Sequence, residues 1–123
     1  MGVPNDKKMQ RFGELLKNER KRSGKKLRDV SAFSGLSVSY ISDIEQGRKG
    51  PPEIEVVRKF ERLFETEKDL LVSAAESERG MMPTQVLSRL QERPILREFF
   101  FRIENEPDET LERWLEEKMR EET

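Results

Sequence analysis

The stretch Leu36–Arg48, with the sequence LSVSYISDIEQGR, decides the fold. Ser37 is suited to cap a helix, because its hydroxyl oxygen can accept a hydrogen bond from the first turn. Gly47 is suited to end one, since it takes the left-handed conformation without a Cβ clash. The apolar residues between them recur at helical spacing: Val38, Ile41 and Ile44, with Tyr40 at the flank. The stretch therefore predicts a short amphipathic helix over residues 38–46.

A second short helix is predicted over residues 27–33, immediately before this stretch. Two short helices that cross at a steep angle need a tight turn, commonly with glycine, and small residues at the crossing. Gly35 supplies the turn, and Ser31 and Ala32 supply the small residues. A generic helical hairpin is the alternative reading of this pair.

The predicted helix over residues 38–46 leaves Ser39, Ser42 and Asp43 facing outward. Small polar side chains let a helix backbone approach the edges of DNA bases. Arg48-Lys49-Gly50 follows at once and supplies cations that can hold phosphates. Such a helix has what is needed to read DNA.

The chain from about Phe12 to Leu71 resembles the five-helix DNA-binding domain of the phage lambda repressor/Cro-like, or XRE-type, family. The matching motifs are Phe12-Gly13-Glu14-Leu15-Leu16 with Arg20 and Gly24, then Val30-Ser31, Gly35-Leu36-Ser37, Tyr40-Ile41-Ser42, Ile44-Glu45-Gln46-Gly47-Arg48 and Pro52-Glu53-Ile54-Glu55. The set is specific because its pieces occur in the right order at the right spacing. The resemblance implies an all-α fold: a five-helix lambda-repressor-like DNA-binding domain followed by a small helical C-terminal extension.

The same resemblance and the outward-facing positions predict the DNA contacts. The base-reading candidates are Val38, Ser39, Ser42 and Asp43, with Val38 able to touch a thymine methyl group. The phosphate candidates are Lys26, Arg28, Gln46, Arg48 and Lys49, and Lys7 and Lys8 are expected to form an arm. Arg20 and Glu45 match a family ion pair that sets the angle of the reading helix; a structural role is expected for it.

Four positions depart from the family pattern. Lys26 and Leu27 stand where members often carry Ser/Thr-Gln, and Ser31 replaces the usual alanine at the helix crossing. Asp43 stands where members often carry an amide or a cation. Asp43 either accepts a hydrogen bond from cytosine N4 or is repelled by phosphate and leaves the reading to Ser39 and Ser42. The sequence therefore leaves the operator undetermined.

Charge is divided unequally along the chain. The whole chain has a net charge of −1, but residues 1–50 contain twelve cations and six acids and the remainder carries −7. This polarity predicts a nucleic-acid-binding end and an end with another purpose. A surface rich in salt bridges is the alternative, and it explains the 40% of charged residues but not their segregation.

Composition argues against several other classes of protein. The chain has no cysteine and no histidine, so disulfides, thiolate zinc sites and the commonest general base are excluded. It has no apolar run long enough for a membrane span, no signal-peptide pattern at its start and no glycine-rich phosphate loop. We therefore expect a cytoplasmic protein that is not an enzyme and has no cofactor, metal or membrane partner.

Helices are predicted along nearly the whole chain. Besides the two central ones, they cover residues 8–23 (burying Met9, Phe12, Leu15 and Leu16) and 54–65, and a capping box at Thr66–Asp69 opens a fifth. A hinge is predicted over residues 76–80, so the domains are expected at 1–76 and 83–123 with a linker at 77–82. Three more helices are expected, over residues 83–91, 94–104 and 107–121.

The C-terminal helices carry aromatic residues on more than one face: Phe99, Phe100, Phe101 and Trp114. This pattern favours a homodimer interface, and a self-contained three-helix minidomain is the alternative. The expected function is a sequence-specific DNA-binding transcriptional regulator, a dimeric repressor that uses residues 38–46 to read double-stranded DNA. An antitoxin whose C-terminal helices bind a toxin, a repressor relieved by another protein, and an interaction adaptor are the other readings.

Overall fold

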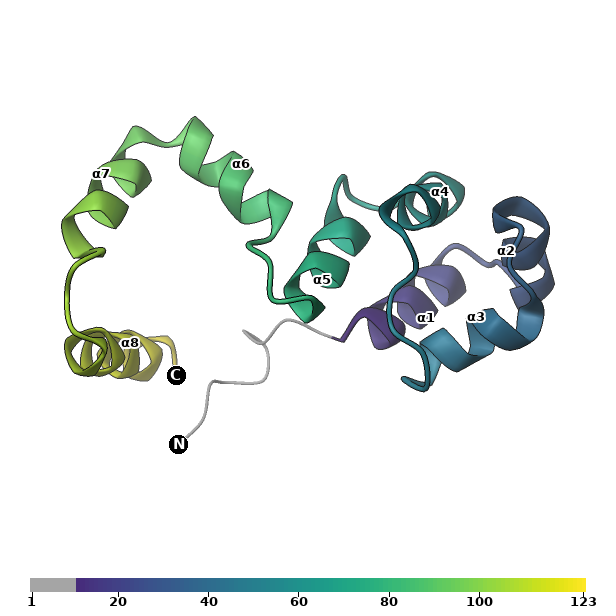
Figure 1. The fold of residues 1–123 in the computed structure, drawn as a ribbon, viewed down its shortest axis with the longest axis horizontal. Coiled ribbons are helices and arrows are strands. Elements are labelled where there is room, and N and C mark those ends of the chain that lie inside the picture. Colours follow the sequence, from purple (N-terminus) through teal and green to yellow (C-terminus); the bar gives the residue numbers. More distant parts are fainter. Residues whose placement is uncertain (1–10) are drawn as a thin grey trace. The chain divides into compact units, whose positions relative to one another are not determined.

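The computed structural model describes residues 11–123, and its regular secondary structure is entirely helical (Figure 1). The helices are α1 (Phe12–Arg22), α2 (Leu27–Ser34), α3 (Val38–Glu45), α4 (Ile54–Phe64), α5 (Leu70–Glu78), α6 (Thr84–Glu92), α7 (Pro94–Ile103) and α8 (Asp108–Glu122). The all-α class is confirmed. The expected arm of Lys7 and Lys8 and the expected core residue Met9 lie outside the described residues.

The chain divides into two compact units between Ser88 and Arg89. In the first unit, α1 to α5 enclose one apolar core, and α2 and α3 both pack within it. Phe60 and Phe64 stack there with ring centroids 6.2 Å apart. The core residues are Phe12, Leu16, Val30, Ile41, Ile44, Val57, Phe60, Phe64, Leu71, Val72, Ala74 and Ala75.

The contact between α1 and α3 depends on a glycine. A Cβ built on Gly13 would lie 2.2 Å from the carbonyl oxygen of Ile44 and 3.0 Å from that of Glu45. Both are backbone atoms near the end of α3, so they have little room to move. Gly13 therefore lets α3 lie directly against α1.

The start and end of α3 follow the sequence prediction. The Ser37 hydroxyl oxygen accepts a hydrogen bond from the Tyr40 N–H at 3.0 Å, as an N-cap should. Gly47 has a φ of 84°, in the left-handed region that ends helices. The preceding turn also contains a left-handed glycine, Gly35, with a φ of 85°. These local signals fix where the helix starts and stops.

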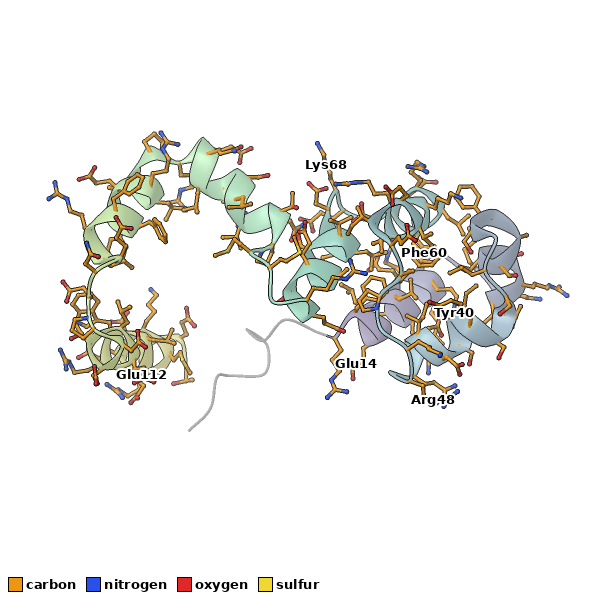
Figure 2. All side chains as sticks on the ribbon, viewed as in Figure 1. Glu14, Tyr40, Arg48, Phe60, Lys68 and Glu112 are labelled. Carbon is orange, nitrogen blue, oxygen red and sulfur yellow. The ribbon has the colours of Figure 1, made fainter. Side chains whose placement is uncertain are left out.

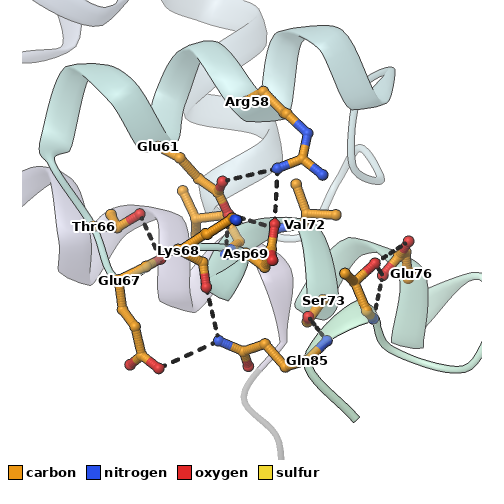
Figure 3. Close-up of polar contacts among 12 residues, drawn as sticks. Arg58, Glu61, Thr66, Glu67, Lys68, Asp69, Val72, Ser73, Glu76 and Gln85 are labelled. Atoms are coloured by element: carbon orange, nitrogen blue, oxygen red, sulfur yellow. Dashed lines mark hydrogen bonds and ion pairs between the residues drawn. The ribbon is translucent and has the colours of Figure 1, made fainter. Parts of the chain in front are cut away.

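The predicted capping box at Thr66 is wrong. The Thr66 hydroxyl donates to the Glu67 carbonyl instead, and α5 begins only after Asp69, whose φ is 65°. The first turn of α5 is capped by Glu61, a buried side chain of α4 whose Oε2 accepts from Leu71 N–H at 2.9 Å and from Val72 N–H at 3.0 Å (Figure 3). A carboxylate at a helix N-terminus is favourable, and here it comes from the neighbouring helix.

Arg58 completes this corner between α4 and α5. Its Nη1 donates to Asp69 Oδ1 at 2.8 Å and lies 3.6 Å from Glu61 Oε1 (Figure 3). The hydrogen bond to Asp69 raises the pKa of Arg58 above its ordinary value. The positive charge of Arg58 thus compensates the charges of two carboxylates that are largely buried.

The predicted hinge over residues 76–80 is also wrong in its first part. Residues 76–78 form the last turn of α5, so the expected linker at 77–82 begins inside a helix. The Glu76 carboxylate accepts from Thr84 N–H at 2.8 Å and from its hydroxyl at 2.7 Å (Figure 3). Ser73 Oγ accepts from Gln85 N–H at 3.1 Å. The first turn of α6 is therefore tied to α5 by hydrogen bonds.

The second unit, from Arg89 onward, has the expected helices to within about a residue at each end but has no core. None of the residues in α6, α7 and α8 is buried. Within this unit, α7 and α8 do not pack against each other. Arg97 Nη1 donates to the last carbonyls of α6, Leu90 O at 2.9 Å and Gln91 O at 2.6 Å, and this joins α6 to α7.

Candidate nucleic-acid interface

α3 has one buried side and one polar side. Ile41 and Ile44 are completely covered, whereas Ser39 is exposed and Ser42 is half-buried. Val38 was predicted both as part of the apolar stripe and as a base contact; it is 42% exposed, so it does not belong to the core. Tyr40, at the flank, is 38% exposed (Figure 2). The predicted base-reading residues therefore share the accessible side of the helix.

Four of the predicted DNA contacts bind one another. Arg48 Nε donates to Asp43 Oδ1 at 2.9 Å, and Arg48 Nη1 donates to Gln46 Oε1 at 2.7 Å. Gln46 Nε2 then donates to Ser42 Oγ at 3.1 Å. The sequence prediction treated Asp43 as a base reader or a repelled charge and Arg48 as a phosphate contact. In the structure the two charges lie together, so Arg48 offsets the repulsion between Asp43 and phosphate.

The predicted pair of Arg20 and Glu45 is present. Arg20 Nε donates to Glu45 Oε2 at 2.7 Å and Nη2 donates to Oε1 at 3.1 Å, which is the two-pronged geometry of a strong pair. Arg20 Nη1 also donates to the Lys25 carbonyl at 3.1 Å. The side chains are only 12% and 5% exposed. The pair connects α1, the turn before α2 and the end of α3.

The remaining phosphate candidates lie on exposed ends of elements. Lys26 occupies the N-cap position of α2, without a side-chain cap, and Arg28 lies in the first turn, where the helix dipole favours anions. Asp29 occupies part of that end, because its carboxylate accepts from Lys26 N–H at 2.8 Å. Lys49 follows α3 in the loop after Gly47 and is exposed. All three cations belong to the same compact unit as α3.

Sequence reasoning missed two features beside α3. A hollow of about 460 Å³ lies between the start of α1 and the end of α3, lined by Phe12, Gly13, Glu45, Gly47, Lys49 and Glu78 among others. The Glu78 carboxylate, from the end of α5, accepts from the Phe12 N–H and so caps α1. No local signal predicts this contact, since 66 residues separate the two partners.

Residues 11–74 match the protein family described as the helix-turn-helix domain. The chain belongs to this family. The match covers just over half of the chain, from the residue before α1 into α5, and it includes the Arg20–Glu45 pair and the turn at Gly35. It leaves out α6, α7 and α8 of the C-terminal part. No curated protein and no solved structure matches the chain.

Membership of the helix-turn-helix domain family indicates a DNA-binding regulator at a coarse level. In this motif the second of the two helices is the one that enters the major groove. α2 and α3, joined at Gly35, are the two consecutive short helices of the matched region. Among residues 11–123, no helix has the length and apolar character needed to cross a membrane.

Proposed function

We propose that the chain is a sequence-specific transcriptional regulator that binds operator DNA as a dimer and represses by occupancy. The observation that carries this proposal is the way α3 is fixed against the rest of its unit. Its buried side is held against α1 through Gly13 and the Arg20–Glu45 pair, while Ser39 and its neighbours remain accessible. A helix held at a fixed angle with small polar residues outward is suited to the major groove.

The contacts are divided between bases and phosphates. Val38 and Ser39, at the N-terminal end of α3, meet base edges, with Val38 beside a thymine methyl group. Asp43 accepts from cytosine N4, and its bond to Arg48 keeps the local charge close to neutral. Lys26, Arg28 and Lys49 bind phosphates and set the register of the domain on the duplex.

In this proposal, helices α7 and α8 of the C-terminal part serve for dimerisation. Phe99, Phe100, Phe101 and Trp114 are between 41% and 63% exposed, and we propose that they lie in the contact between two copies. A two-fold dimer places its two reading helices about 34 Å apart, or a multiple of that, on a palindromic operator. Repression then follows from blocking polymerase. No catalytic step and no cofactor belong to this proposal.

Selection of bound duplexes from a random pool, followed by footprinting, tests the function directly. The expected result is an enriched palindrome with half-sites one helical turn apart, or a multiple of that. The Ser39→Ala and Asp43→Ala variants are selected in parallel, and each is expected to lose preference at one half-site position, worth about 1–3 kcal/mol. Absence of any enriched sequence would reject operator binding and favour the adaptor.

The exposed apolar surface of α6 to α8 also favours a second candidate, an antitoxin. In that case the C-terminal helices cover a toxin, and the helix-turn-helix domain represses the shared operon. Co-expression with the product of the neighbouring gene distinguishes the two. Growth arrest by the neighbour alone, relieved by residues 89–123 of this chain, would identify the antitoxin.

A further inference from the structure

The C-terminal unit lacks what an independent fold needs. α7 has 10 residues and α8 has 15, and isolated helices of this length are marginal in water. Their large apolar side chains are uncovered, with exposed fractions of 59% for Phe99, 63% for Phe101 and 56% for Leu115. α7 and α8 do not pack against each other, although only residues 104–107 separate them. Within this unit, neither helix covers the apolar side chains of the other.

The two helices carry opposite charge. α7, together with its N-cap residue, has three arginines and one glutamate: Arg93, Arg97, Arg102 and Glu98. α8 has seven acids against three bases; the acids are Asp108, Glu109, Glu112, Glu116, Glu117, Glu121 and Glu122. The partner of α7 should therefore be an acidic amphipathic helix, and the partner of α8 a basic one.

These charges border the apolar stripes. At 100° per residue, the stripe of α7 that contains Phe99 and Phe100 has Arg93 on one edge and Arg102 on the other. The stripe of α8 that contains Leu111, Trp114 and Leu115 is bordered by Glu112 and Glu121, and one cation, Lys118, lies on the stripe between them. All four charged residues are exposed; Arg102 is paired with Glu98 at 2.8 Å and Glu121 with Lys118 at 3.8 Å, and these exposed pairs within one helix are weak. Each stripe thus has the flanking charge that attracts the other.

We propose that two copies of this chain pair reciprocally, with α7 of each copy packed against α8 of the other. This pairing rests on the proposed dimer and identifies its surface. A two-fold interface brings residue i against j and j against i, so one arrangement supplies an acidic stripe to both basic ones. A different protein would have to offer an acidic helix and a basic helix together, whereas a second copy has both.

A charge-swap experiment on the full chain tests the pairing. Variant A carries R93E and R102E, so acidic residues border the apolar stripes of both α7 and α8. Variant B carries E112K and E121K, so basic residues border both stripes. Each variant alone is expected to dimerise at least tenfold more weakly than the unchanged chain in sedimentation. An equal mixture of A and B is expected to form a heterodimer, because each reversed helix then meets an opposite charge.

The matched control is E109K with E116K, which changes the charge of α8 as much as variant B but on the side away from the stripe. It is expected to leave dimerisation within about twofold of the unchanged chain. Trp114 is the single tryptophan, so its emission is expected to shift to shorter wavelength when the dimer forms. Circular dichroism checks that all variants remain helical. If variant B loses its helical signal, the milder variant E112Q with E121Q replaces it.

The outcomes separate the pairing from the proposed function. A heterodimer from A and B supports reciprocal pairing. Dimers of both variants alone, a mixture that stays monomeric, or an unchanged chain that is monomeric at 50 µM would each overturn it. Half-site DNA binding at low salt is measured in parallel and should be equal in all variants. Absence of DNA binding even in the unchanged chain would count against the regulator and not against the pairing.

Discussion

The same residue type has opposite surroundings in the two units of this molecule. Phe60, in α4, is completely covered by its neighbours (Figure 2), whereas Phe99, in α7, is 59% exposed. α1 to α5 meet around a shared core, while α7 and α8 do not pack against each other within their own unit. An amphipathic helix therefore needs a second apolar surface to cover its own apolar side. The first unit contains its own partner surfaces, and we propose that a second copy supplies them to the C-terminal helices.

The largest expected effect contrasts these two aromatic residues. Phe60→Ala should destabilise the helix-turn-helix unit by about 3–5 kcal/mol, because it leaves a cavity in a close-packed core. Phe99→Ala should change the unfolding of that unit by less than about 0.5 kcal/mol and weaken dimerisation instead. Urea unfolding followed by circular dichroism measures both. Equal losses in the two variants would mean that the C-terminal helices have a core of their own.

The next effect concerns ion pairs. Glu45→Ala should cost about 3 kcal/mol, because it leaves the guanidinium of Arg20 largely buried without its partner. The matched control is Glu98→Ala, which removes the carboxylate that Arg102 binds at 2.8 Å in α7, where both side chains are mostly exposed. That change should cost about 0.5 kcal/mol or less. If the two variants lost equal amounts of unfolding free energy, the Arg20–Glu45 pair would not contribute to holding α3 in place.

Gly13 tests how closely α3 lies on α1. Gly13→Ala should cost about 1–3 kcal/mol, since its Cβ would meet the Ile44 carbonyl oxygen at 2.2 Å. Gly50→Ala is the control, because a Cβ at that position would meet nothing within 4 Å. DNA affinity is measured beside stability. We expect Gly13→Ala to lower both, and a variant that is fully stable would show that the helices have more room than the structure gives them.

A smaller effect is expected from single cations. Lys49→Ala should reduce the slope of log affinity against log salt by about one unit, as for one lost phosphate contact. Lys68→Ala, at the exposed turn before α5, is the control and should leave the slope unchanged. Arg48→Ala should have less effect on the slope than Lys49→Ala, because Arg48 is already bonded to Asp43. A slope that changes equally in all three variants would remove the loop after α3 from the interface.

The smallest change in domain stability is expected from truncation. The boundary belongs after Ser88, because Thr84 and Gln85 are hydrogen-bonded to α5. Residues 1–88 should remain folded, with an unfolding free energy within about 1 kcal/mol of the full chain measured as a monomer. The fragment should sediment as a monomer and bind a full palindrome more weakly than the intact chain. Dimers of residues 1–88 would move the interface into the helix-turn-helix unit.

The parts that could be predicted from the sequence depend on neighbours a few residues apart. Ser37 and Tyr40, which form the cap of α3, are three residues apart, and Gly35 and Gly47 need no distant partner for their conformations. The Arg20–Glu45 pair spans 25 residues and could be expected only because the resemblance implied it. The family assignment rests on the same local pattern and holds at the level of the helix-turn-helix domain.

The errors came where distant groups compete for one partner. Thr66 has the residue pattern of a cap, yet Glu61 from α4 takes that role because the fold aims its carboxylate at two buried N–H groups. The pattern of residues 76–80 indicated a hinge, but Glu76 binds Thr84 and secures the junction. The bond between Asp43 and Arg48 was not predicted, because it depends on how the chain turns after α3; the base-reading role of Asp43 stays a prediction.

The sequence by itself therefore determined the helical class, the position of α3 and the segregation of charge between the two halves, because periodicity, capping and composition are local or additive properties. Tertiary structure decided which polar group caps which helix, how closely α3 lies on α1, and which aromatic residues are covered. Those outcomes depend on surfaces that meet only after folding. In the first unit the chain supplies such surfaces, and in the C-terminal helices it leaves them exposed.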